Sequence, residues 1–173
     1  RLDAATLLAY LRAYLLLAPW LKRRMDIDLS RSLSPYIDDF PEDYARKVVA
    51  ASYDPGGLAE LMDDYLEANP TRNRGLDMLP VFAHLDEARV MAHPVEKELV
   101  KPRPALHYRL PNCRIDDADW SAGLEWEHWM RVEALADDRD ALRALGREFL
   151  GTPPFPLDVF TESWADKMER WLA

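Results

Sequence analysis

The chain has 173 residues, a formal net charge of −9 at pH 7 and a pI of about 4.9, and 49% of its residues are hydrophobic. This length and composition are typical of one soluble globular domain with a buried core, or of a large fragment of one. The negative charge argues against general nucleic-acid binding, so we expect no nucleic-acid partner. The single cysteine, Cys113, excludes an internal disulfide bond and indicates a reducing compartment, for which we expect the cytoplasm.

The N-terminal segment predicts a helix that begins after Asp3 and ends at about Pro19, since leucines recur there at helical spacing. Arg12 interrupts this apolar run, which is shorter than the roughly 20 residues that a membrane span needs. The pattern therefore predicts a core helix and no membrane association. Three basic residues, 22–24, are expected in a solvated last turn, where cations suit the helix dipole.

The next part of the chain predicts further helices separated by loops. Residues 26–40 read as a loop, Pro41 begins a helix that runs to about Tyr53, and residues 54–57 break it. A helix over 58–68 has one apolar face and is ended by Asn69-Pro70, because the residue before proline is disfavoured in a helix. Residues 76–85 predict either a short helix or an extended segment kinked at Pro80, and the pattern leaves both open.

Residues 104–112 are the best strand candidate. Alternation places Ala105, His107 and Arg109 on one face and Leu106, Tyr108 and Leu110 on the other. One face is apolar enough to pack on a core, whereas the other presents an imidazole and a guanidinium two residues apart.

The C-terminal third predicts three helices. The first begins near Asp117 or Asp119, continues through Leu135, and has an apolar arc broad enough to predict good burial, with His128 on the surface. The second spans about 139–150. The last helix is amphipathic with aromatic anchors, and it either caps the core or binds a second copy of the chain. Its apolar residues are Phe160, Trp164, Met168 and Trp171. The predicted fold class is α+β, predominantly helical with few strands.

Arg72 and Arg74 are close together without neighbouring acids. Either they pair with acids elsewhere in this acid-rich chain, or they hold a carboxylate or phosphate, which the planar guanidinium does well. The residue types alone do not decide between these interpretations.

Two segments carry a resemblance to a known family. Arg-Asn-Arg-Gly-Leu-Asp-Met-Leu at 72–79 and Ala-Leu-His-Tyr-Arg-Leu-Pro-Asn at 105–112 resemble the C-terminal half of the amidoligase family. These are carboxylate–amine ligases with a glutamine-synthetase-like fold, whose corresponding strand is of the type Thr-Val-Glu-Phe-Arg-Leu-Phe-Asn. Arg109 and Asn112 match its Arg and Asn, whereas His107 stands where the family has a Glu expected to bind a divalent metal.

The resemblance implies an ATP-dependent ligase for small-molecule or peptide carboxylates and amines. It implies that Arg109 and Asn112 are catalytic, that Arg72, Arg74 and Arg109 bind substrate or phosphate, and that His107 either binds metal or marks a lost ligand. Imidazole suits Mn²⁺ better than Mg²⁺, so either ion is a candidate cofactor beside ATP.

The remaining family carboxylates for metal belong to an N-terminal half that we do not find in this sequence. We therefore expect residues 1–173 to form either a single domain or the C-terminal fragment of a larger amidoligase-like domain. The alternative function is a non-catalytic helical interaction module, homo-oligomeric through its Trp-rich C-terminus.

Overall fold

The structure is a computed structural model that describes residues 2–25, 37–111, 114–152 and 157–173, with the side chains of 157–163 left out. These residues form eight helices and one two-stranded antiparallel sheet, which confirms a predominantly helical chain with few strands. The helices are α1 (Ala4–Arg24), α3 (Glu42–Val49), α4 (Leu58–Ala68), α5 (Leu79–Leu85), α6 (Glu87–Ala92), α7 (Ala122–Asp137), α8 (Arg139–Gly151) and α9 (Leu157–Leu172); the strands are β1 (Leu76–Asp77) and β2 (His107–Tyr108).

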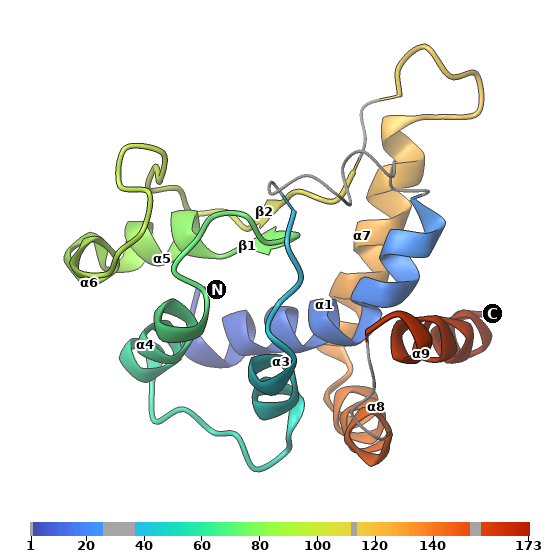
Figure 1. The fold of residues 1–173 in the computed structure, drawn as a ribbon, viewed down its shortest axis with the longest axis horizontal. Helices are drawn as coiled ribbons and strands as arrows, with labels where there is room; N and C mark the ends of the chain where they lie inside the picture. The colour runs from blue at the N-terminus through green and yellow to red at the C-terminus, as the bar shows by residue number, and fades with distance from the viewer. Residues whose placement is uncertain (1, 26–36, 112–113, 153–156) are drawn as a thin grey trace.

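Helix α1 lies at the centre of the molecule and packs against α3, α4, α7, α8 and α9 (Figure 1). The Asp3 carboxylate caps its N-terminus by accepting a hydrogen bond of 2.9 Å from the Thr6 N–H, as predicted. By length and composition alone α1 could cross a membrane, but in this structure it is the core helix that the pattern predicts. The predicted end at Pro19 is wrong: the helix continues to Arg24 and changes direction along its length (Figure 1), as a proline without an N–H allows.

Arg12, the one charged residue within the apolar part of α1, binds the end of α3. Its guanidinium donates to the carbonyl oxygens of Val48 (2.7 Å), Ala50 (3.0 Å) and Tyr53 (2.6 Å). The last carbonyls of a helix lack partners within the helix, so this side chain satisfies them. Helix α3 therefore ends at Val49 and not near Tyr53 as predicted, because a residue 36 positions away in the sequence binds its C-terminus.

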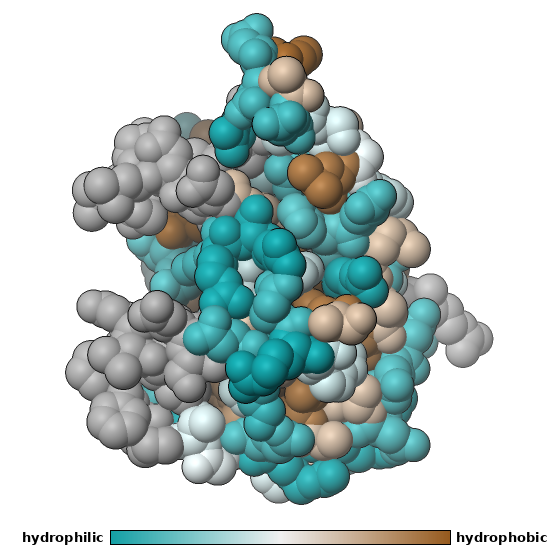
Figure 2. All heavy atoms as spheres, turned by 90° about the vertical axis from the view of Figure 1, so that its right-hand side faces the viewer, coloured by the Kyte–Doolittle hydropathy of each residue, from teal (hydrophilic) through white to brown (hydrophobic). Residues whose placement is uncertain are grey.

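The C-terminal helix caps the core. Trp164 and Met168 of α9 are buried, and the Trp164 indole donates to the Leu16 carbonyl at 2.7 Å. Arg23 and Arg24 form ion pairs with Asp166 and Glu169, so the last turn of α1 is bound to α9 and is not simply solvated. The face that carries α9 is largely hydrophilic with separate hydrophobic patches (Figure 2). The Phe160 side chain lies outside the described residues.

The sheet answers the question that the pattern left open at residues 76–85. Both interpretations apply in turn: residues 76–77 form β1, and α5 follows with Pro80 in its first turn, where no N–H is needed. Strand β2 is shorter than predicted, since two residues pair with β1 in the register Leu76 to Tyr108 and Asp77 to His107. The predicted alternation is confirmed in part: residues 105 and 107 are exposed and Leu110 is fully buried, whereas residues 106, 108 and 109 are all half-buried.

Gly75 lets the strand pair approach α1. A Cβ at this position would overlap with the hydroxyl of the buried Tyr14 and would lie 3.0 Å from Leu110. Any larger residue would therefore push β1 away from the core.

The prediction that the whole of α7 is well buried is wrong. The buried residues of α7 are Trp129, Val132, Leu135 and Ala136. Leu124, Trp126 and Met130 are 41%, 61% and 44% exposed. His128, predicted on the surface, is half-buried and packs edge-on against Trp20, with ring centroids 5.8 Å apart. The periodicity identifies the helix, but α1 covers only part of its apolar arc.

Candidate functional site

The pairing of β1 with β2 places a buried carboxylate beside a half-exposed imidazole. Asp77 is 2% exposed, and its Oδ1 accepts a hydrogen bond of 3.0 Å from the Leu79 N–H. Its Oδ2 lies 3.4 Å from Nδ1 of His107, whose side chain is 50% exposed. A buried acid is thus in contact with a base that solvent can reach.

Arginine side chains surround this pair. Arg109 donates from Nη1 to the Arg72 carbonyl oxygen at 2.9 Å, and its backbone N–H donates to Gly75 at 2.8 Å, so the strand and the loop before β1 are held together. Arg72 and Arg109 lie close enough to shift the pKa of both Asp77 and His107, and Arg103 acts on His107 as well. The Arg72 guanidinium has no ion pair or hydrogen bond to other residues that the structure describes.

Glu96 fixes the loop that carries Arg72. Its carboxylate accepts hydrogen bonds from the Thr71 hydroxyl (3.0 Å) and from the Arg72 backbone N–H (3.3 Å). The position of the Arg72 backbone is therefore set from two sides, by Glu96 and by Arg109.

Burial and charge act in opposite directions on the buried carboxyl. Burial raises the pKa of Asp77 to about 7, although the Leu79 N–H and the charges of Arg109 and Arg72 favour its ionised form. Burial is also the main reason that the pKa of His107 is lowered, and the three arginines lower it further. Asp77 therefore exchanges its proton near neutral pH, and the neutral form of the His107 imidazole is favoured, beside positive charge that suits an anion.

Arg74 has a different environment from Arg72, although the two are only two residues apart. It is 9% exposed, donates from Nε to Asn69 Oδ1 at 2.9 Å and from Nη1 to the Asp39 carbonyl, and lies over the Phe40 ring at 5.7 Å. Its guanidinium thus links the segment before α3 to the loop before β1. The structure brings Arg72, His107 and Arg109 together, and Arg74 supports them from within the core; Asn112 lies outside the described residues.

A metal ion would find an incomplete set of ligands here. Asp77 and His107 supply two donors, and no group of three or more His, Cys, Asp or Glu side chains that could hold a metal occurs among the described residues. The described residues therefore do not fit a complete divalent-metal site.

Sequence reasoning missed Asp77, Glu96 and Arg103. Asp77 had one visible signal, since a carboxylate inside the apolar run Leu76 to Leu79 is expected to have a specific partner. Arg103 and Glu96 had none, because their proximity to the strand site depends on how the connection from α6 to β2 folds.

The geometry thus defines a mostly helical protein with a basic, proton-exchanging site on a short two-stranded sheet. A family model described as "Putative amidoligase enzyme" matches residues 1–131, so the chain belongs to that family and the resemblance is confirmed. The match covers α1 to the first part of α7 and includes the whole candidate site. No curated protein and no solved structure matches the chain.

Proposed function

We propose that the protein is an ATP-dependent carboxylate–amine ligase or the C-terminal portion of one, with β1 and β2 as part of a glutamine-synthetase-like sheet. Family membership is the observation that carries this proposal. In such a reaction the γ-phosphoryl group of ATP passes to the substrate carboxylate and ADP leaves. The amine then attacks the acyl phosphate, an amide forms, and inorganic phosphate leaves. The carboxylate and the amine belong to small molecules or peptides.

Arg72 and Arg109 are the residues that we assign to the phosphate oxygens. Positioning and charge neutralisation dominate phosphoryl transfer, and the guanidinium fork suits both. The hydrogen bond from Arg109 to the Arg72 backbone supports a joint role, because it fixes the two residues relative to each other. Arg103 adds positive charge at the exposed edge. The family resemblance assigns Asn112 to the catalytic residues.

His107 and Asp77 are the groups that we assign to proton transfer. The amine must lose a proton as it forms the amide, and an acceptor works best when its pKa is near the working pH. The lowered pKa of His107 keeps the imidazole neutral at pH 7, so that it accepts a proton. Asp77, at 3.4 Å, stabilises the imidazolium that results.

The test is calorimetric titration of ATP with Mg²⁺, and separately with Mn²⁺, into the chain and three variants. Arg72→Ala removes one guanidinium, and Arg109→Gln keeps an amide that can donate to the Arg72 carbonyl. Arg143→Ala is the matched control, because it makes the same change of charge on α8 at a side chain that is 61% exposed. We expect each site variant to weaken ATP binding by about tenfold or more, the effect of one charge-assisted contact, and the control to leave it unchanged.

Equal ATP binding by all four proteins would show that Arg72 and Arg109 do not bind ATP. If the chain binds no ATP, the same titration on the full-length native protein decides whether the rest of a larger domain is required. Absence of binding there too would contradict the ligase proposal and favour the interaction module.

A further inference from the structure

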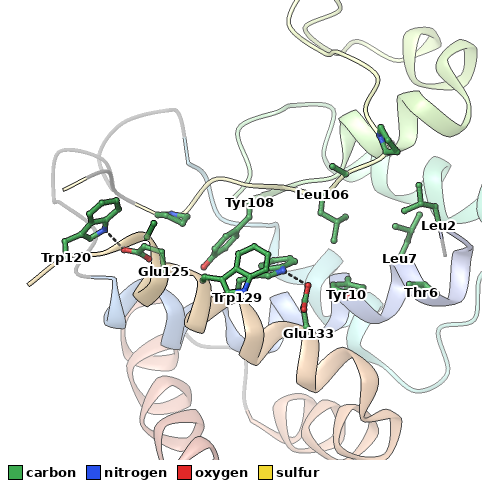
Figure 3. Close-up of a pocket in the computed structure, with 15 residues that line it drawn as sticks. Leu2, Thr6, Leu7, Tyr10, Leu106, Tyr108, Trp120, Glu125, Trp129 and Glu133 are labelled. Atoms are coloured by element: carbon green, nitrogen blue, oxygen red, sulfur yellow. Dashed lines mark hydrogen bonds between the residues drawn. The ribbon is translucent and has the colours of Figure 1, made fainter. Parts of the chain in front are cut away.

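A groove of about 690 Å³ runs between the first half of α1, residues 104–111 and α7 up to Glu133 (Figure 3). Leu106 and Tyr108 line it, so it lies on the face of β2 opposite His107 and Arg109. Its volume is in the range of sites that hold small organic molecules. It is therefore a second candidate site, separate from the basic one.

Aromatic side chains form a continuous part of the groove lining. Tyr10 stacks on Trp129 with ring centroids 6.1 Å apart, and Tyr108 lies 4.9 Å from Trp129 on the other side. Trp120 and Trp126 extend the wall, and Trp126 is 61% exposed. The faces of such rings are electrically negative and attract organic cations, tryptophan most strongly.

The charged groups of the groove have the same sign. Two glutamates, Glu125 and Glu133, line it, and none of its described lining residues is a lysine, arginine or histidine. Each glutamate accepts a hydrogen bond from a neighbouring indole (Figure 3): Trp120 to Glu125 at 3.0 Å and Trp129 to Glu133 at 2.8 Å. These bonds fix the carboxylates in position without neutralising them.

Glu133 is the carboxylate that remains accessible to a ligand. The second oxygen of Glu125 is buried and lies 3.5 Å from Nδ1 of His128, on the side away from the groove. The carboxylate of Glu133 is half-buried beside Tyr10 and Trp129. Its negative charge also acts on Tyr10, whose pKa is raised first by burial and then by Glu133 and Asp137.

We propose that this groove binds an organic ammonium ion with an aromatic or aliphatic body. The body packs between Leu106, Tyr108 and the indoles, and the ammonium group contacts Glu133 and the nearby ring faces. Charge complementarity identifies this ligand class, since a neutral apolar molecule would leave Glu133 without a counter-charge and an anion would be repelled. The proposal does not depend on ligase activity.

The test uses three probes of similar shape and different charge in the absence of ATP: 2-phenylethylammonium, 2-phenylethanol and 3-phenylpropanoate. Binding is measured by calorimetry and by quenching of tryptophan fluorescence. We expect saturable binding of the ammonium probe, about tenfold weaker binding of the alcohol, and no binding of the carboxylate.

Matched variants locate the charge. Glu133→Gln retains an oxygen that can accept from Trp129, whereas Glu127→Gln makes the same change on the exposed side of α7. We expect Glu133→Gln to weaken binding of the ammonium probe by about tenfold and Glu127→Gln to leave its binding unchanged. Trp126→Ala should weaken binding of the ammonium probe about fivefold, and because Trp126 is 61% exposed the substitution should leave the fold intact.

Two results would overturn the proposal. One is the absence of any charge dependence, which would appear as equal binding of the charged and neutral probes or as equal effects of the two glutamate variants. The other is a dimer in sedimentation that Trp126→Ala dissociates, because a second copy would then occupy the groove. Neither result bears on Arg72 or Arg109, which lie across β2, so failure here is distinct from failure of the ligase proposal.

Discussion

The two faces of β2 carry different chemistry although their side chains are one residue apart. On one face, His107 lies 3.4 Å from a buried carboxylate and is subject to the charges of three arginines, and polar contacts hold the site together. On the other, Tyr108 is part of the aromatic packing of the core, 4.9 Å from Trp129 and 6.3 Å from Tyr14. Substitutions on the first face should therefore change charge and binding, whereas those on the second should also change stability.

The largest expected effect comes from removing the support that both faces share. Gly75→Ala places a methyl group against the hydroxyl of fully buried Tyr14, which has no room to rotate away, so β1 must shift. We expect the free energy of unfolding to fall by about 2–4 kcal/mol, as for other overpacked cores, and ATP and ammonium binding to weaken together. Denaturant unfolding measures this.

Gly151→Ala is the control, because a methyl there meets nothing within 4 Å. If Gly75→Ala were as stable as this control, the close approach of β1 to α1 would not be a constraint on the fold.

A second pair of substitutions tests the contrast directly. Tyr108→Ala removes a ring that packs on two aromatic neighbours and should cost about 2–3 kcal/mol, whereas His107→Ala, at a half-exposed side chain, should cost less than about 1 kcal/mol. Thermal and denaturant unfolding of the two variants gives the comparison. A cost at His107 equal to that at Tyr108 would mean that the charged face also stabilises the fold.

The smallest expected effect concerns pH. The pKa of Asp77 is raised from 3.8 to about 7, so between these values the folded protein holds a proton that the unfolded chain has released. Its contribution to stability is complete below pH 4 and is lost as the pH rises through 7. His107 acts in the opposite direction, because its lowered pKa makes protonation favour the unfolded chain.

As the pH rises from 4.5 to 7.5, the free energy of unfolding should therefore fall less in Asp77→Asn than in the wild type, by about 1–2 kcal/mol. Melting temperatures across this range measure the difference, with Asp140→Asn as the control at a carboxylate that is 96% exposed. A wild type and Asp77→Asn variant with parallel pH profiles would show that this carboxyl is not perturbed by burial.

Local patterns predicted those parts of the fold that local interactions determine. Helix α4 occupies residues 58–68 as predicted, since its apolar face and the Asn-Pro stop both lie within the segment. The two faces of β2 also followed from alternation alone. In the same way, Asp3 identified the start of α1, because its capping hydrogen bond joins residues only three positions apart.

Features that depend on distant residues were not predictable in this way. The end of α3 is set by Arg12, and the exposure of Trp126 depends on how far α1 extends along α7. Arg72 and Arg74 look alike in the sequence, but Arg72 lies at the site, whereas Arg74 is buried with its guanidinium over the Phe40 ring. The role of Asp77 needs the strand register, which pairs it with a residue 30 positions later.

The central position of α1 has a consequence for how the chain is made. This helix is synthesised well before its main partners α7, α8 and α9, which begin only at residue 122. At about 5–20 residues per second, synthesis leaves the longest apolar helix without these partners for several seconds. Of the elements that the structure describes, α3, α4 and the β1–β2 pair are the partners that can cover it during that interval. We therefore expect the nascent chain to depend on chaperones that bind exposed apolar segments, more than the finished protein does.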